Sequence, residues 1–510
     1  MGMKKILWLA LGGVLCSNVW AEDDITVVSP NDFHGQVLPN KNMVGAAKIS
    51  TYLQKFRQKY PNTIVVLAGD NYQGTAISNL SYGQVDTDFF NYIGVKFSAI
   101  GNHEFDYGQK AFESWNKTSN FKFLAANIIE SDSGKVFKYA QPYGEVTLQN
   151  GKKIAFIGLA TLETPSTTVS YNINNLNFTD PVKAANQWVN YLNSDKNLQG
   201  KPDTIALLTH IPSRQESNGK IDYMPLPELK TNELDYVSKN VHGISAILSG
   251  HSHLLVDGTI NGVTVVQGAS QGKDLSVLHY DCHSQPKCIV TPEIINLAEA
   301  TKDLQPDPVV DGIVNHYVEQ NKAILDKVIA TSAVELRNHP ESGSLYNIEL
   351  TYTLADVIKR TTNSDIGLLN TYGVRRSLPI GSVTYSMIYE AMPFDNTVTT
   401  VDIKGKDLLP LIKHSLPKDS VQTGVFAGVK IELKNDAIKK VWVGGKPLDL
   451  KKTYRLATVN FIAAGGDGFD FSHATNLDDS HVTIREVIHS DWQKNGINIP
   501  VDWQNITVVK

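Results

Sequence analysis

The residues with the most evident chemistry form five short polar motifs, all in the first half of the chain. The candidate ligands among them are two carboxylates, one amide and four imidazoles, without a thiolate. Such mixed oxygen and nitrogen donors suit Zn²⁺, Mn²⁺ or similar cations and argue against a structural zinc site of the cysteine type. The motifs are Asp32-Phe33-His34-Gly35, Gly69-Asp70, Gly101-Asn102-His103-Glu104-Phe105-Asp106, Thr209-His210 and Gly250-His251-Ser252-His253.

Each motif follows a short apolar run that predicts a buried β-strand. Because ligands bind outside the carboxyl ends of strands in α/β sheets, the sheet would gather all five motifs on one edge. A single motif could be a surface turn or a helix cap, but five in order favour a metal site. The predicted strands are Ile25–Ser29, Thr63–Ala68, Phe97–Ile100, Lys153–Leu159, Thr204–Leu208 and Ile244–Leu248, and all but Lys153–Leu159 precede a motif.

Composition limits the class of protein. At 510 residues the chain is too long for one ordinary core, so two or three domains are expected. Hydrophobic residues make up 42% and charged residues 19%, which is typical of a globular enzyme and excludes bulk disorder. A formal net charge of -5 provides no basic surface for a nucleic-acid polymer.

The pattern along the chain predicts two domains joined by a helix. The first half alternates strands with amphipathic stretches such as Ala46–Phe56, and becomes richer in strand over Val263–His279. Two prolines in Asp303–Pro308 then precede a predicted connecting helix, Val309–Val328. Later strands are predicted at Val398–Ile403 and Val429–Leu433. The expected divisions are a signal peptide at 1–21, a metal domain at 22–302, a linker helix at 303–329 and a second domain at 330–510.

The amino-terminal segment predicts a secretory signal peptide. Lys4 and Lys5 precede the apolar run Ile6–Leu15, and small residues lead to an expected cleavage site after Ala21. The run is too short to span a bilayer. A lipid anchor at Cys16 is the alternative, and the bulky residue before that cysteine disfavours it. A periplasmic or secreted protein without stable membrane insertion is therefore expected.

Two cysteines remain after the signal peptide, Cys282 and Cys288, with Pro286 between them. In an oxidising compartment this pair predicts a structural disulfide that closes a small loop. A redox-active or metal-binding pair is the alternative, and it is disfavoured because the spacing is not C-x-x-C.

The motifs resemble those of the calcineurin-like metallophosphoesterases. The longer strings NDFHG, AGDNYQGT and GNHEFDYG resemble in particular the secreted 5′-nucleotidase and UDP-sugar hydrolase family. The second half of the chain is similar to the nucleotide-binding domain of the same family. The matching motifs there are Asn370-x-x-Gly373-Val374-Arg375, Pro393-Phe394-x-Asn396 and Phe461-x-Ala463-x-Gly465-Gly466-Asp467-Gly468.

The resemblance implies an α/β fold, in which a four-layer α/β/β/α metallophosphoesterase domain is followed by a smaller α+β substrate-binding domain. It implies one metal held by Asp32, His34, Asp70 and His253, and a second held by Asp70, Asn102, His210 and His251. It makes His103, oriented by Asp106, the group that stabilises the transition state. The implied substrate contacts are Arg337, Asn370, Arg375, Phe394, Asn396, Phe461 and Asp467.

Two departures from the family pattern concern the substrate site. Thr371 and Tyr372 stand where the family usually has consecutive glycines before the arginine, so that Tyr372 would narrow the site. Arg337 precedes a Glu-Ser pair, Glu341-Ser342, at a looser spacing than the family pattern.

The activity that the resemblance implies is hydrolysis of nucleoside 5′-monophosphates such as AMP to nucleoside and phosphate. The nucleophile would be a hydroxide that bridges two divalent ions, Zn²⁺, Mn²⁺ or Co²⁺. The alternatives are a broader activity on UDP-sugars, NAD or nucleoside di- and triphosphates, a non-catalytic nucleotide-binding protein, and a sulfur-compound hydrolase. Intact ligand positions disfavour the non-catalytic protein, and paired phenylalanines with Asp467 disfavour the sulfur-compound hydrolase. The metal ligands and the base contacts lie in different domains, so catalysis is expected to require the two domains to close.

Overall fold

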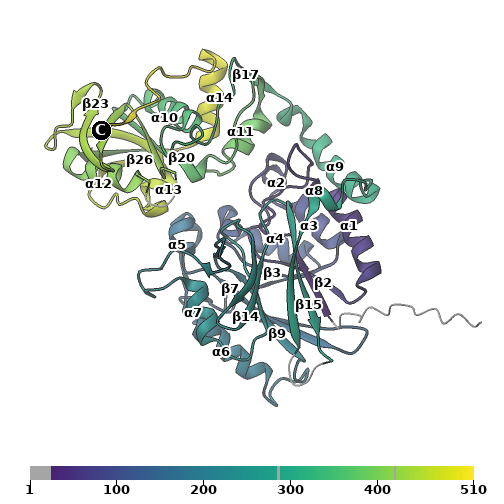
Figure 1. Ribbon diagram of the computed structural model, residues 1–510. Helices are drawn as coiled ribbons and strands as arrows, with labels where there is room; N and C mark the ends of the chain where they lie inside the picture. Colours follow the sequence, from purple (N-terminus) through teal and green to yellow (C-terminus); the bar gives the residue numbers. More distant parts are fainter. Residues whose placement is uncertain (1–24, 284–287, 418–420, 510) are drawn as a thin grey trace, which may run out of the picture.

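Two six-stranded sheets form the centre of the first domain in the computed structural model, which describes residues 25–283, 288–417 and 421–509 (Figure 1). The predicted signal peptide lies outside the described residues. The first sheet has the order β16-β15-β1-β2-β3-β4, with β1 to β4 parallel and β15 antiparallel to β1. Its strands are β1 (Ile25–Ser29), β2 (Thr63–Leu67), β3 (Val95–Ala99), β4 (Lys122–Leu124), β15 (Asp274–Asp281) and β16 (Ile289–Asn296).

The second sheet has the order β13-β14-β12-β9-β7-β6, and its four central strands are parallel. Antiparallel hairpin partners form both of its edges. Its strands are β6 (Tyr143–Thr147), β7 (Lys153–Ala160), β9 (Thr204–His210), β12 (Ala246–Leu248), β13 (Val256–Ile260) and β14 (Val263–Gln267).

Alternation of side chains along each strand produces four layers. Ile25 and Val27 of β1 pack between the two sheets, whereas Val28 packs outward against helices. Helices cover the outer face of each sheet. The predicted α/β/β/α arrangement is thereby confirmed. The covering helices are α1 (Gly45–Lys59), α3 (Gln84–Tyr92) and α4 (Ala111–Thr118) on one side, and α6 (Pro181–Leu192) and α7 (Glu233–Asn240) on the other.

Shorter elements of the first domain lie in its connections. The helical segments among them are α2 (Ala76–Leu80), η1 (His103–Tyr107), α5 (Thr164–Thr167), η2 (Ser170–Asn172) and α8 (Leu297–Ala300). The strands form two small antiparallel pairs, β5 (Ile128–Glu130) with β8 (Leu176–Phe178), and β10 (Arg214–Gln215) with β11 (Ile221–Asp222).

The connecting helix α9 spans Pro308–Leu325 and is fixed to the first domain. Asp307 caps it by accepting the N–H of Val309 at 2.9 Å, and the same carboxylate accepts hydrogen bonds from Ser50 and Gln54 of α1. The prediction of a helix here is confirmed, but its predicted end at Val328 is wrong. Val328 instead begins strand β17, where it pairs with β19.

The second domain is a smaller α+β unit around one apolar core (Figure 1). Its sheets have the orders β21-β18-β25-β20-β26 and β24-β23-β22-β27, beside the pair β17 and β19. The strands are β17 (Val328–Ser332), β18 (Ile366–Asn370), β19 (Gly381–Thr384), β20 (Thr397–Lys404), β21 (Gly424–Ala427), β22 (Val429–Lys434), β23 (Ala437–Val443), β24 (Lys446–Pro447), β25 (Thr453–Val459), β26 (Thr475–Thr483) and β27 (Ile506–Val508). The helices are α10 (Glu349–Thr361), η3 (Thr371–Gly373), α11 (Tyr385–Ala391), α12 (Gly405–Ser415), α13 (Asn460–Ala463), η4 (Gly466–Gly468) and α14 (Ile484–Asn495).

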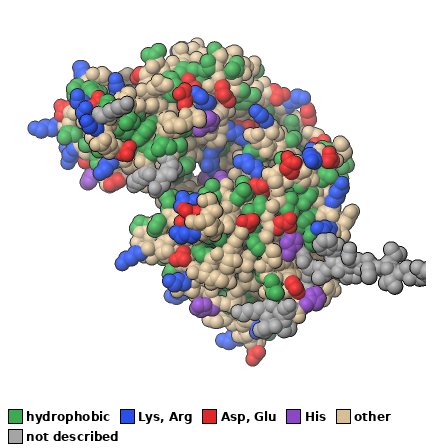
Figure 2. All heavy atoms as spheres, in the orientation of Figure 1, with side chains coloured by type: hydrophobic (Ala, Val, Ile, Leu, Met, Phe, Trp, Pro, Cys, Tyr) green, Lys and Arg blue, Asp and Glu red, His purple; other side chains and the backbone are tan. Residues whose placement is uncertain are grey.

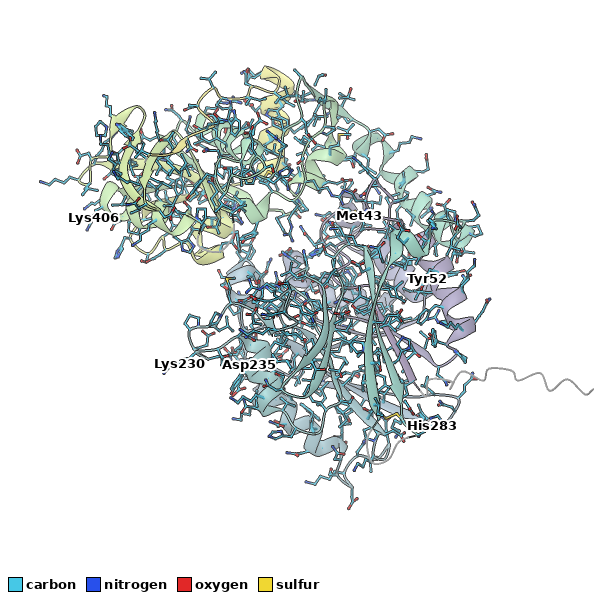
Figure 3. The ribbon with its side chains drawn as sticks, in the orientation of Figure 1. Met43, Tyr52, Lys230, Asp235, His283 and Lys406 are labelled. Atoms are coloured by element: carbon cyan, nitrogen blue, oxygen red, sulfur yellow. A yellow bond between two sulfur atoms is a disulfide. The ribbon has the colours of Figure 1, made fainter. Side chains whose placement is uncertain are left out.

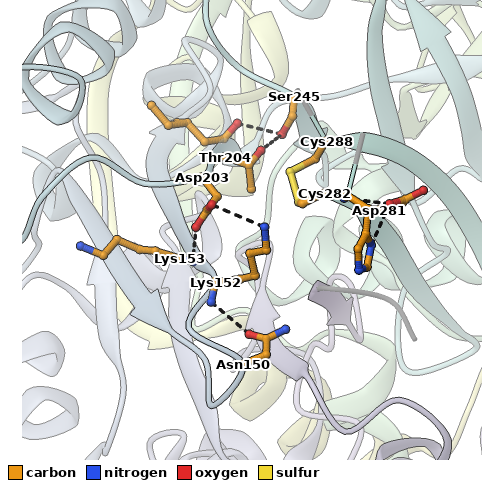
Figure 4. The surroundings of a disulfide bond; sticks show 11 residues. Asn150, Lys152, Lys153, Asp203, Thr204, Ser245, Asp281, Cys282 and Cys288 are labelled. Atoms are coloured by element: carbon orange, nitrogen blue, oxygen red, sulfur yellow. Dashed lines mark hydrogen bonds and ion pairs between the residues drawn. A yellow bond between two sulfur atoms is a disulfide. The ribbon is translucent and has the colours of Figure 1, made fainter. Parts of the chain in front are cut away.

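The predicted disulfide between Cys282 and Cys288 is present (Figure 4). It packs against the core between the two sheets. Around it lie Lys153 and Thr204, which begin β7 and β9, so the disulfide is at the amino ends of the parallel strands. The polar motifs lie at the opposite, carboxyl ends. In the part of the chain that the structure describes, no helix has the length and apolar character needed to cross a membrane.

We expect Cys282→Ser combined with Cys288→Ser to lower the free energy of unfolding by about 2 kcal/mol, because the bond restricts a short loop in the unfolded chain. This corresponds to a fall in Tm of about 4 °C for a domain of this size. The metal content should stay unchanged, because the disulfide lies at the far end of the sheets. Thermal unfolding and metal analysis test both points, and loss of metal from the double variant would contradict a purely structural role.

Candidate metal centre and substrate cavity

The five polar motifs meet at one edge of the paired sheets. The ligand atoms of Asp32, His34, Asp70 and His253 all lie within 4.8 Å of one another. Those of Asp70, His210 and His251 form a second group of the same compactness, and Asp70 belongs to both. Asn102 follows β3, lines the same cavity as Asp70 and His251, and donates its side-chain N–H to the Thr167 carbonyl at 3.2 Å. The structure therefore brings together the residues that the resemblance assigns to two metals.

The chemistry of these side chains fits divalent cations. Among the described residues, Asp32 Oδ2 and Asn102 Oδ1 are buried acceptors without a hydrogen-bond partner, an arrangement that is costly unless a cation or another donor satisfies it. His34 Nδ1 lies 2.8 Å from the Gln73 carbonyl and therefore carries the hydrogen, which leaves the Nε2 lone pair facing His253 Nε2 at 3.0 Å. Two nitrogens that converge in this way are suited to share a metal.

The electrostatic environment differs from one candidate ligand to the next. Burial raises the pKa of Asp32 to about 7, with a further increase from the Asp70 carboxylate. Burial also lowers the pKa of His34 to about 3, so this imidazole is neutral at physiological pH. His210 differs, because burial lowers its pKa but the Asp70 carboxylate outweighs burial and raises the pKa to about 10. A metal bound there would replace that proton, since histidine binds metals as the neutral imidazole.

The backbone of the metal edge is strained. Five of the seven candidate ligands have positive φ angles, which non-glycine residues adopt rarely. Glycine permits the close approach of the turns: a Cβ at Gly101 would lie 2.2 Å from Asp70 Oδ1. The turns are therefore held by their surroundings rather than by local preference. The five are Asp32 (44°), His34 (49°), Asp70 (52°), His251 (72°) and His253 (59°).

His103 and Asp106 form a hydrogen-bonded pair beside the metal ligands. They lie in the 3₁₀ helix η1, where residues three apart face the same side, and His103 Nδ1 is 2.7 Å from Asp106 Oδ2. Burial lowers the pKa of His103, but the carboxylates of Asp106 and Asp70 outweigh it, and the pKa is raised overall. The arrangement favours the imidazolium form, which can stabilise negative charge.

Glu104 is a supporting residue that sequence analysis named only as part of a motif. Its side chain is fully buried, and its carboxylate accepts the backbone N–H groups of Asp70 at 2.9 Å, Asn71 at 2.7 Å and Gly101 at 2.7 Å. It thus ties the turn after β2 to the turn after β3. The sequence offered one indication of this role, because Glu104 directly follows the two candidate site residues Asn102 and His103.

Glu163 and Gln267 also support the ligands, and sequence analysis missed both. Glu163 Oε2 lies 3.1 Å from His251 Nε2, so the carboxylate orients this imidazole. Gln267 is fully buried at the end of β14 and donates to Ser252 Oγ at 2.7 Å and to the Leu254 carbonyl at 2.5 Å. These bonds brace the turn that carries two histidines. Neither residue stands in a local motif, so no signal in the sequence marked them.

A cavity of about 460 Å³ extends from the metal edge between the two domains. Figure 2 shows the hollow between the domains, with basic and histidine side chains on its walls. The first domain contributes metal ligands, the His103–Asp106 pair and Glu163. From the second domain the cavity is lined by six predicted substrate contacts and by Tyr372. These contacts are Asn370, Arg375, Phe394, Asn396, Phe461 and Asp467.

Arg337, the seventh predicted contact, is not among the lining residues. Its guanidinium is partly exposed and donates to Glu341 Oε1 at 3.2 Å. Arg375 is the arginine that faces the centre: burial lowers its pKa, while Asp70 and Asp106 act in the opposite direction. We therefore leave Arg337 out of the proposed phosphate site.

The aromatic and polar groups of the second domain are held in place. The ring of Phe394 stacks on His103 with centroids 5.1 Å apart, and Arg375 lies 5.5 Å from the same ring. Asn370 donates to Asp467 Oδ2 at 2.7 Å. Phe461 rests on Gly466, where a Cβ would lie 2.5 Å from the ring. The cavity thus has a charged end at the metal ligands and aromatic walls beyond them.

Comparisons with known proteins agree with this architecture. The family model for the calcineurin-like phosphoesterase matches residues 26–255, and that for the 5′-nucleotidase C-terminal domain matches residues 328–474. Protein UshA of Yersinia enterocolitica is 28% identical over 489 residues, which cover 88% of each chain. A 5′-nucleotidase of Vibrio parahaemolyticus is 27% identical over 494 residues, covering 87% of this chain and 84% of the relative.

Among solved structures, the chain is similar to a 5′-nucleotidase precursor from Thermus thermophilus. The TM-score is 0.78 at 23% identity, over 95% of this chain and 99% of the other. At that identity the likeness concerns the fold, and it extends through both domains.

We expect Glu104→Gln to lower metal affinity about 10- to 100-fold, because the amide would turn an N–H toward backbone donors and loosen both turns. Isothermal titration of the metal-free protein with Mn²⁺ measures this. Asp86→Asn is the matched control, since Asp86 is equally buried but contacts Ser78. Equal affinities in Glu104→Gln and the unmodified protein would exclude the supporting role.

We expect Asp106→Asn to move the alkaline limb of the kcat–pH profile about one pH unit lower, because His103 loses the carboxylate that raises its pKa. If His103 stabilises negative charge, its active form is the protonated one, and activity should fall as pH rises through that pKa, earlier in the variant than in the unmodified protein. Initial rates from pH 5 to 10 at saturating substrate test this. An unshifted limb, with metal content unchanged, would show that another group controls it.

Proposed function

We propose that this chain, which belongs to the 5′-nucleotidase family and is a metal-dependent hydrolase, removes phosphate from nucleoside 5′-monophosphates such as AMP. The observation that supports this most directly is the composition of one cavity. Two groups of metal-binding side chains lie at one end of it, and two phenylalanines, Phe394 and Phe461, line it from the other domain. A ligand that carries both a phosphate and an aromatic base would fit this cavity, with its phosphate at the metal-binding side chains and its base at the phenylalanines.

Side chains of the second domain bind the different parts of the substrate. Arg375 binds the phosphate through its guanidinium, and Phe394 and Phe461 stack with the base. Asn396 and the Asn370–Asp467 pair offer hydrogen bonds to the ribose or the base. The cavity is lined from both domains, so that a bound phosphate would meet fixed polar groups of each.

The seven ligands from Asp32 to His253 would hold two divalent ions, Zn²⁺, Mn²⁺ or Co²⁺. When bound, these supply Lewis acidity toward the phosphate and lower the pKa of water to produce a nucleophile. His103 donates a hydrogen bond to the phosphate oxygens as negative charge develops on them, and Asp106 keeps it protonated and oriented. Asp70 Oδ1 accepts the backbone N–H of His103 at 2.9 Å, which fixes the pair relative to the ligands.

We also propose a periplasmic or secreted location. The disulfide between Cys282 and Cys288 is consistent with an oxidising compartment. The predicted signal peptide at 1–21 would direct the chain there. In that location the enzyme would act on nucleotides outside the cytoplasm.

The proposed function predicts base-dependent catalysis. Phosphate release from AMP with added Mn²⁺ should be abolished by chelation and restored by Mn²⁺, Co²⁺ or Zn²⁺. Phe461→Ala and Phe394→Ala should raise the KM for AMP about 5- to 100-fold, since stacking on an aromatic ring stabilises a bound base by about 1–3 kcal/mol. p-Nitrophenyl phosphate, which has no base or ribose, should be affected far less.

Trp442→Ala is the matched control, because Trp442 is an aromatic residue of the same domain that does not line the cavity. Equal losses with both substrates would make the two phenylalanines packing residues. A panel with ADP, ATP, UDP-glucose and NAD, compared by kcat/KM, decides between a monophosphatase and the broader nucleotide hydrolase. Full activity in metal-free protein would contradict the two-metal centre.

A further inference from the structure

The loop that carries Phe394 is held through three consecutive backbone carbonyls. Within the second domain, Arg485 of α14 donates to the carbonyls of Met392, at 3.0 Å, and Phe394. Arg485 is almost fully buried, and its guanidinium also pairs with Asp395. The carbonyl between these two, that of Pro393, faces the first domain instead.

Two buried amides of the first domain donate to that one carbonyl. Gln73 Nε2 lies 2.6 Å and Asn79 Nδ2 lies 2.5 Å from the Pro393 oxygen. Both side chains are more than nine-tenths buried. Among the described residues Gln73 Oε1 has no hydrogen-bond partner. The Gln73 amide therefore takes part in this contact only as a donor, through Nε2. Other contacts also join the domains, including Arg376 with Gln36.

The same two amides are tied to the catalytic centre. The backbone carbonyl of Gln73 is the partner of His34 Nδ1, at 2.8 Å. Asn79 Oδ1 accepts a hydrogen bond from the hydroxyl of Tyr107, at 3.1 Å, and Tyr107 ends the helix η1 that bears His103. This acceptance fixes the orientation of the Asn79 amide and leaves its Nδ2 to donate to Pro393.

We propose that Gln73 and Asn79 are positioning residues that fasten the Phe394 loop to the metal domain, so that the ring seated on His103 is placed only when the domains are closed. The assignment of Phe394 as a base contact rests on the proposed function. The fastening couples recognition of the base in one domain to the phosphate chemistry in the other. A substrate without a base gains little from it, which makes the two amides determinants of specificity.

Kinetics of Gln73→Met and Asn79→Ala test the coupling. Each variant loses one donor, and kcat/KM for AMP should fall about fivefold. The fall with p-nitrophenyl phosphate should be much smaller. In a Phe394→Ala background neither substitution should change kcat/KM for AMP more than twofold, because the loop no longer carries the ring. Gln109→Met is the matched control, since Gln109 also donates to a backbone carbonyl, that of Asn174, but outside the cavity.

A second experiment measures domain closure directly, by energy transfer between the two domains in the absence of substrate. Lys230→Cys and Lys406→Cys place a fluorophore pair on exposed positions of the two domains, across the cleft from each other and both at the left in Figure 3. Under non-reducing conditions Cys282 and Cys288 remain bonded and unlabelled. Adding Gln73→Met and Asn79→Ala should lower the mean energy-transfer efficiency of the pair, because fewer molecules are closed.

The outcomes separate the two hypotheses. Additive losses in the Phe394→Ala background, or equal losses with both substrates, would overturn the coupling. An unchanged transfer efficiency would overturn the fastening. If Phe394→Ala itself affects AMP and p-nitrophenyl phosphate equally, the proposed base contact has failed, and the transfer measurement still decides whether the two amides hold the loop.

Discussion

The carboxylate of Asp70 is the group on which the rest of the site depends. One carboxylate oxygen accepts the backbone N–H of His103 at 2.9 Å, and the other lies 3.1 Å from His210 Nε2. Its backbone N–H is bound by Glu104, and it belongs to both groups of candidate ligands. Burial alone would raise the pKa of Asp70, but the imidazoles of His210 and His103 hold it well below its ordinary value. The acid therefore stays ionised in a place where an isolated charge would be costly.

Holding such a group requires a rigid support, which the paired sheets provide. Asp70 follows a buried strand of the first sheet, and His210 ends a buried strand of the second. The turns after these strands have strained backbones, and strain of this kind persists only where the surroundings determine the geometry. Packing between the sheets and the hydrogen bonds of Glu104 and Gln267 hold these turns in their strained geometry.

Much of this could be predicted because strands and motifs are local signals. Ile25–Ser29 was predicted with its observed bounds, whereas β3 begins earlier than predicted, at Val95, because the exposed Lys96 interrupts the apolar run. Strand β9 runs on to His210, since pairing with β7 continues past the apolar residues. Glu163 and Gln267 could not be predicted, because their roles arise only when segments distant in sequence meet. Arg337 shows the converse, since a motif placed it at the phosphate and the fold pairs it with Glu341.

The residues that line the cavity come from both domains, so their relative positions depend on the contacts between the domains. The start of the connecting helix α9 is fixed to the first domain, because Asp307 binds Ser50 and Gln54 of α1. Tyr317 of the same helix donates to Asp88 at 2.6 Å, which fixes its middle. A rotation of the second domain must therefore be absorbed between Leu325 and Val328, where α9 ends and β17 begins. Leu325 to Val328 do not line the cavity, so a change of backbone angles there would move the second domain and its Phe394 loop together. Local contacts at that loop are then needed to define the closed state.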